Sequence, residues 1–113
     1  MPMRVGFAQY RKDLLERELA TIEKLLPTLG VEKGILVGDM VSGECKPDSA
    51  IELIFVHDTD RPFGRRADFF SYHLDSQVAV DTQVYTPEEF ERLKDTLPAL
   101  HHACRKGRVI YDA

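Results

Sequence analysis

The segment VGDMVSGECKPDSAIELIFV, residues 37–56, predicts the end of one strand, a turn and a second strand. The apolar run 34–37 has no polar alternation, which is typical of a strand covered on both faces. Gly38 follows it, residues 39–42 predict one helical turn closed by Gly43, and Lys-Pro-Asp-Ser at 46–49 is typical of a turn. Residues 51–57 predict the second strand.

The flanking sequence predicts helices alternating with strands. Residues 10–29 carry leucine and isoleucine at three- and four-residue steps, which predicts an amphipathic helix, and residues 65–74 predict another. Residues 77–85 predict a third strand with Val80, Thr82 and Val84 on one face and Asp81 on the other. Thr86 and Pro87 then predict a capped helix start, followed by a short helix at 97–105 and a strand or extended tail at 109–111. This order predicts an α/β or α+β sheet with helices against it.

Length and charge restrict the class of protein. The chain has 113 residues, which predicts a single domain covering 1–113. Its formal net charge of −4 argues against duplex nucleic acid as a partner, because the phosphate backbone requires a basic face. No run approaches the ~18 apolar residues that a membrane span needs, and the start of the chain does not resemble a signal peptide. Cys45 and Cys104 fit no metal-ligand spacing, so we expect reduced thiols and a cytoplasmic location.

The predicted turn between the first two strands resembles a nucleotide site with altered ligands. Nucleotidyl transfer with two Mg²⁺ ions uses carboxylates at positions i and i+2 of a strand, because these point to the same face. A third acid on the neighbouring strand and a glycine turn that donates N–H groups to phosphates complete such a site. Here Gly38 and Asp81 provide the turn and the third acid, whereas Ala50 and Glu52 occupy the i and i+2 positions.

These motifs resemble the minimal nucleotidyltransferases, small members of the DNA polymerase beta-like superfamily. That family has Gly-Ser where this chain has Gly38-Asp39, a glycine matching Gly43, and Ser-Asp-x-Asp-Leu matching SAIEL at 49–53. Asp81, TPEEF at 86–90 and a Gly-x-x-x-Tyr tail at 107–111 continue the similarity over nearly the whole chain. The resemblance implies a nucleotidyltransferase-like fold: a small mixed sheet of three to four strands, with helices packed mainly on one side.

The resemblance also implies roles for individual residues. Gly38, Asp39 and Ser49 match nucleotide-binding positions, and Glu52 and Asp81 match two of the three catalytic acids. Mg²⁺ would be held by Glu52 and Asp81, with Asp48 as a possible replacement for the acid missing at Ala50. The departures affect the chemistry, because Asp39 repels phosphate, Ala50 offers no ligand and Glu52 is one methylene longer than aspartate.

Two functions follow as expectations. In the first, the protein has reduced or lost catalysis and acts as a nucleotide-binding or partner-binding module, paired with a HEPN-type helical protein as in toxin–antitoxin-like systems. In the second, it is an active Mg²⁺-dependent enzyme that transfers a nucleoside monophosphate from a nucleoside triphosphate (NTP) to a hydroxyl group of a protein or small molecule. The resemblance implies the helical partner, and a homo- or hetero-oligomer is compatible with either function.

Other side chains offer weaker alternatives. Arg61, Arg65 and Arg66 could contact a phosphate, although a solvated charge cluster is the expected arrangement. His101 and His102, with His57 or His73, fit no standard ligand spacing for a metal.

Overall fold

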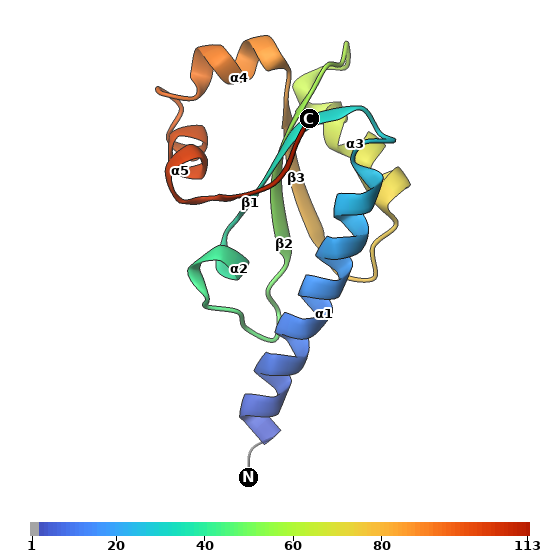
Figure 1. Ribbon diagram of the computed structural model, residues 1–113, viewed down its shortest axis with the longest axis vertical. Coiled ribbons are helices and arrows are strands. Elements are labelled where there is room, and N and C mark those ends of the chain that lie inside the picture. Colours follow the sequence, from blue (N-terminus) through green and yellow to red (C-terminus); the bar gives the residue numbers. More distant parts are fainter. Residues whose placement is uncertain (1–2) are drawn as a thin grey trace.

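The computed structural model describes the backbone of residues 3–113 and the side chains of residues 9–113. Five helices and four strands alternate along this part of the chain (Figure 1). In order they are α1 (Met3–Leu25), β1 (Val31–Val37), α2 (Asp39–Ser42), β2 (Ile51–His57), α3 (Phe63–Leu74), β3 (Val80–Tyr85), α4 (Pro87–Leu93), α5 (Pro98–Lys106) and β4 (Arg108–Asp112).

The strands form one mixed sheet in the order β3-β2-β1-β4. β1 runs antiparallel to both β2 and β4, and β2 runs parallel to β3. The parallel pair is joined through α3, whereas the antiparallel pair β1 and β2 is joined by the loop that contains α2. The expected α+β fold with a small mixed sheet is therefore confirmed, and the layout is consistent with a nucleotidyltransferase-like architecture.

Two apolar layers cover the two faces of the sheet. The larger layer holds α1 and α3 against one face, where Leu19, Phe55 and Phe70 are almost completely buried. The smaller layer holds α4 and α5 against the other face, with Ile54, Phe90 and Leu100 at its centre. The two longest helices thus pack on one side, as expected, while α4 and α5 add a second, thinner layer (Figure 1). Because side chains alternate along a strand, Glu52 and Asp81 face the α4–α5 side.

Several element boundaries differ from those expected. The first helix, expected over 10–29, spans Met3–Leu25, and residues 26–30 form turns instead of a last helical turn. Pro27 explains the early end, because proline disfavours helical backbone at the residue before it. β1 begins at Val31 rather than at residue 34, since its first residues pair with the end of β2.

The expected cap at Thr86 is confirmed and extended by a partly buried ion pair between Arg66 and Glu89. Thr86 Oγ1 accepts a hydrogen bond from the Glu89 backbone N–H, and the Glu89 carboxylate accepts one from the Thr86 backbone N–H at 2.9 Å. The same carboxylate receives both Nη groups of Arg66, whose side chain is 9% exposed. Arg66 also donates to the Val84 carbonyl, so this pair joins α3, β3 and α4. Hydrogen bonds from Arg66 and Thr86 lower the Glu89 pKa to about 2.

Across the helices of residues 3–113, none is both long and apolar enough to cross a membrane.

Candidate functional site

The loop between β1 and β2 begins at a glycine with unusual backbone geometry. Gly38 has φ 84° and ψ −152°, a region that side-chain-bearing residues essentially do not adopt. Asp39 is the first residue of α2, so Gly38, rather than Asp39, occupies the cap position of this short helix. Gly43 ends the helix in the left-handed region and donates its N–H to the Asp39 carbonyl at 3.0 Å. The expected turn with glycine at both ends is thus present.

Ser49 closes this loop by binding Asp39. Its side-chain oxygen accepts the Lys46 backbone N–H at 2.7 Å and donates to Asp39 Oδ2 at 2.8 Å. Ser49 is 4% exposed, and both hydrogen bonds are partly buried. The sequence suggested that Asp39 and Ser49 contact a nucleotide, and the structure shows that their side chains contact each other.

Arg11 of α1 holds the same loop from outside. Its Nε and Nη2 donate to the Ser49 carbonyl oxygen at 3.1 and 2.8 Å. A guanidinium that binds one oxygen through two N–H groups fixes both the distance and the orientation of its partner. Local sequence patterns did not predict this role, because Arg11 precedes Ser49 by 38 residues.

The two expected catalytic acids lie side by side. Glu52 of β2 and Asp81 of β3 are partners in the parallel register. Asp81 is exposed, whereas Glu52 is partly covered, and the Glu52 carboxylate lies against the Cα of Gly38. Two carboxylates and the glycine turn are therefore brought together, as the assignment of strand faces predicted.

These residues line two adjoining clefts under α5. One, of about 320 Å³, is lined by Glu52, Asp81 and Gln83 together with Val37, Gly38, Leu53, Ile54, Ala99 and His102. The other, of about 450 Å³, is lined by Asp39, Ser42 and Lys106 together with Val37, Gly38, Val41, His102 and Gly107. Val37, Gly38 and His102 belong to both clefts, so Gly38 lies at the junction of an acidic and a basic part of the site.

The acids present do not match a two-metal site. Ala50, which the family resemblance matches to the first metal ligand, supplies no side-chain oxygen, and Asp48 is exposed in the turn at 46–49 and lines neither cleft. Within the described residues, no three His, Cys, Asp or Glu side chains are grouped as a metal site would require. Glu52 and Asp81 could still hold one hydrated Mg²⁺ that takes its other ligands from phosphate and water. They are too few to clamp the attacking and leaving oxygens with two ions.

The basic part of the site comes from α5 and was not identified from the sequence. His102 and Lys106 are four residues apart, so they lie on the same side of that helix. The sequence patterns indicated His102 only as a member of a histidine cluster, and they did not indicate Lys106. The i, i+4 spacing of the two residues was visible, but which side of α5 would face Gly38 depends on packing against β1.

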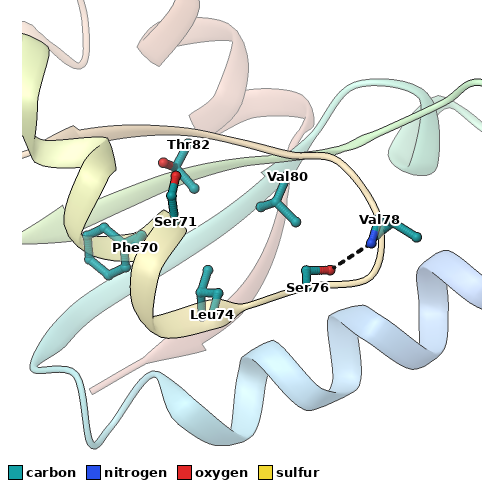
Figure 2. Close-up of a pocket in the computed structure, with 7 residues that line it drawn as sticks. All are labelled: Phe70, Ser71, Leu74, Ser76, Val78, Val80 and Thr82. Carbon is teal, nitrogen blue, oxygen red and sulfur yellow. Dashed lines mark hydrogen bonds between the residues drawn. The ribbon is translucent and has the colours of Figure 1, made fainter.

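The other candidates lie elsewhere. Arg66 is bound to Glu89, and Arg65 forms an ion pair with Asp68 at 3.0 Å. His57 stacks on Phe69, and burial of the His57 imidazole lowers the pKa of that side chain. Figure 2 shows a further pocket of about 170 Å³ between α3 and β3, where Ser76 Oγ accepts the Val78 N–H. Its lining of Phe70, Ser71, Leu74, Ser76, Val78, Val80 and Thr82 contains no ionisable side chain, which makes it a weaker candidate for a functional site.

A scan against models of known protein families finds no match, and a search of curated proteins finds no significant match to this sequence. Function is therefore inferred from the residues around Gly38 and from the motifs that they form.

Proposed function

We propose that this protein is a nucleotidyltransferase-like domain with reduced or lost transfer activity that acts as a binding module, for a nucleotide in the clefts beside Gly38 or for a partner protein. One observation carries this proposal: Glu52 and Asp81 are paired on neighbouring strands, while Ala50 leaves the position of the bridging acid without a ligand. A reaction that depends on two-metal electrostatics loses several kcal/mol of transition-state stabilisation without that acid.

The larger cleft supports the binding of a small ligand. Its volume of about 450 Å³ is within the usual range for ligand sites, and Val37 and Val41 give it apolar surface beside a few polar groups. Asp39 and Ser49 use their side-chain oxygens to bind each other, which leaves the loop ordered without a phosphate. A site that retains its shape but lacks part of its chemistry fits a binding role.

The adjacency of Glu52 and Asp81 favours one alternative, an active Mg²⁺-dependent nucleotidyltransferase. Both carboxylates lie beside Gly38, where phosphates would approach the backbone most closely. In that case an NTP would supply the nucleoside monophosphate and a protein or small-molecule hydroxyl would accept it. The methylene that Glu52 adds relative to aspartate makes this the weaker proposal.

We also propose a cytoplasmic location and a HEPN-type helical partner. Cys45 and Cys104 are free, which is compatible with a reducing compartment. The partner is supported by the family resemblance alone. Coexpression with the product of the neighbouring reading frame, followed by size-exclusion chromatography, tests whether a stable complex forms.

Calorimetry and a transfer assay distinguish the two functions. The protein is titrated with ATP and the other NTPs, with and without Mg²⁺, and labelled nucleotide is sought on the protein or on a coexpressed partner. Mg²⁺-dependent transfer that is abolished in Glu52→Ala, but not in the matched control Glu44→Ala, would overturn the proposal of reduced catalysis. Glu44 is an exposed acid of the same loop that lines neither cleft.

A restored ligand set provides the complementary test. Ala50→Asp combined with Asp39→Ser returns the first metal ligand and the family serine. We expect the native protein to show no transfer and the double variant to gain Mg²⁺-dependent NTP binding. If NTP binding depends on Mg²⁺ equally in the native protein and the double variant, the residues at 39 and 50 do not explain the proposed loss of transfer activity.

A further inference from the structure

The larger cleft places two basic side chains opposite the glycine turn. His102 and Lys106 of α5 line this cleft together with Gly38 and Asp39. Leu100 and Ala103, both almost completely buried, fix α5 against the sheet. Gly107 packs directly against Ile35 and the Leu36 carbonyl, leaving no room for a side chain. The end of α5 is thereby held close to β1, and the exposed residues His102 and Lys106 line the cleft.

The basic groups of this cleft have no intramolecular acidic partner. Among residues 9–113, neither His102 nor Lys106 forms a salt bridge or a side-chain hydrogen bond. Two arginines on nearby elements differ in this respect: Arg11 donates to the Ser49 carbonyl and Arg108 pairs with Glu16. Among the described residues that line the larger cleft, Asp39 is the only acid, and its carboxylate already accepts a hydrogen bond from the Ser49 hydroxyl.

The distribution of charge separates the two parts of the site. Glu52 and Asp81 line the smaller cleft on the far side of Gly38, and Lys106 does not reach it. An anion that enters the larger cleft therefore meets a lysine ammonium and an imidazole, and it avoids the acid pair. A lysine binds phosphate as a point charge and needs no divalent ion to do so.

We propose that the larger cleft binds a phosphate chain through Lys106 and His102 without a divalent metal ion. This inference rests on the nucleotide-binding form of the proposed function and assigns the phosphate contacts to α5 rather than to the acid pair. The phosphates would belong to a nucleotide, with its sugar and base against Val37 and Val41, or to a free polyphosphate. These two sources share the same phosphate chemistry and differ in the apolar contacts.

Titration in EDTA tests the inference. The protein is titrated with ATP and, separately, with inorganic pyrophosphate, by calorimetry at about 0.15 M salt, where the Debye length is about 8 Å. We expect binding without Mg²⁺, weakened about tenfold in Lys106→Ala and more strongly in Lys106→Glu. Arg105→Glu is the matched control: Arg105 is an exposed neighbour on α5 that lines neither cleft, and the expected change is below about twofold. Thermal denaturation of each variant verifies folding, and Lys106→Arg retains the charge and should retain binding.

The outcomes separate this inference from the proposed function. Tighter binding of ATP than of pyrophosphate, with both lost in Lys106→Glu, supports a nucleotide; equal affinities support a polyphosphate site. ATP binding that requires Mg²⁺, disappears in Glu52→Ala and is indifferent to Lys106→Glu would overturn the inference while leaving a nucleotide-binding protein. Failure of both anions to bind in EDTA would overturn it as well, whatever the NTP titrations with Mg²⁺ show.

Discussion

The Ser49 hydroxyl donates a hydrogen bond to the Asp39 carboxylate at 2.8 Å. This contact joins Asp39, the first residue of α2, to Ser49, which lies two residues before the start of β2. The similarity to minimal nucleotidyltransferases places a phosphate-binding serine at position 39. Here an aspartate stands at that position, and its carboxylate accepts a hydrogen bond from the Ser49 hydroxyl. The loop is thus held by an internal contact between Asp39 and Ser49.

Removal of that hydroxyl should destabilise the protein. In Ser49→Ala, the Asp39 carboxylate loses its donor and the Lys46 N–H loses its acceptor, both near a residue that is 4% exposed. Unsatisfied polar groups at such a site cost about 1–3 kcal/mol, so we expect the free energy of unfolding to fall by about 2 kcal/mol. Urea denaturation measures this. Ser42→Ala removes an exposed 3.3 Å hydrogen bond and should change stability by less than about 0.5 kcal/mol.

Arg11 should control the local stability of the loop. Arg11→Ala removes both donors to the Ser49 carbonyl, so we expect faster hydrogen exchange at residues 44–50, with little change in β2. Mass spectrometry of exchanged peptides provides the measurement. Arg17, an exposed arginine of the same helix, is the control. If Arg11→Ala and Arg17→Ala have the same exchange pattern, Arg11 does not hold the loop.

Local sequence patterns predicted most of the fold. The predicted strand at 51–57, the turn closed by Gly43 and the cap at Thr86 rest on short-range signals, and each is present. The boundaries that differ depend on long-range pairing. β1 begins at Val31 because its first residues pair with the end of β2. β4 forms because Arg108–Asp112 pairs with the other edge of β1. Local propensity does not contain that information.

The acidic part of the site was predictable and the basic part was not. Alternation along β3 placed Asp81 on the face opposite Val80 and Thr82, and the family resemblance implied a place beside Glu52, its partner in the parallel register. Lys106 was missed because its place depends on the close packing of Gly107 on β1, which no local pattern in α5 encodes. The contact between Ser49 and Asp39 was missed for a related reason: it depends on how the nine residues between them fold back.

Gly38 should resist substitution for two separable reasons. Gly38→Ala places a side chain in a backbone region reserved for glycine, which costs about 1–3 kcal/mol, and its Cβ would overlap the Glu52 carboxylate. We expect Gly38→Ala to lower the free energy of unfolding by about 3 kcal/mol when Glu52 is present. In Glu52→Ala the overlap disappears, so the loss should be about 1 kcal/mol smaller. Denaturation of the native protein, Gly38→Ala, Glu52→Ala and the double variant gives the coupling energy between the two positions.

A matched glycine supports that interpretation. Gly64 lies in the first turn of α3 with open space where a Cβ would be, so Gly64→Ala should be neutral or stabilising by up to about 1 kcal/mol. Equal losses for Gly38→Ala with and without Glu52 would show that backbone geometry alone is responsible.

The ion pair between Arg66 and Glu89 should make stability depend on acid pH. The pKa of Glu89 falls from 4.5 to about 2 in the folded protein. A carboxylate with a lowered pKa stabilises the native state above its unfolded pKa, and this contribution disappears as the pH falls from about 4.5 towards 2. At neutral pH we expect Glu89→Gln to cost on the order of 2 kcal/mol, with the difference from the native protein shrinking across that acid range.

Denaturant unfolding at a series of pH values between 2 and 7 checks this dependence. Glu88→Gln is the control, because Glu88 is exposed in the same first turn of α4 and has no partner among the described ion pairs. A difference between Glu89→Gln and the native protein that stays constant from pH 7 to 2 would assign the effect to packing instead of to the charge.

Neutralising Asp39 should strengthen anion binding in the larger cleft. Asp39 is the only acid among the residues that line it, and its charge opposes that of Lys106. Asp39→Asn keeps an oxygen that can accept the Ser49 hydroxyl but removes the negative charge. In a solvent-accessible cleft, repulsion between the Asp39 carboxylate and a bound anion contributes about 1 kcal/mol. Pyrophosphate in EDTA should therefore bind about fivefold more tightly to Asp39→Asn. Asp48→Asn alters net charge equally at an exposed position outside both clefts, so it isolates the local effect. Unchanged affinity in Asp39→Asn, or an equal gain in Asp48→Asn, would mean that anions do not bind beside Asp39.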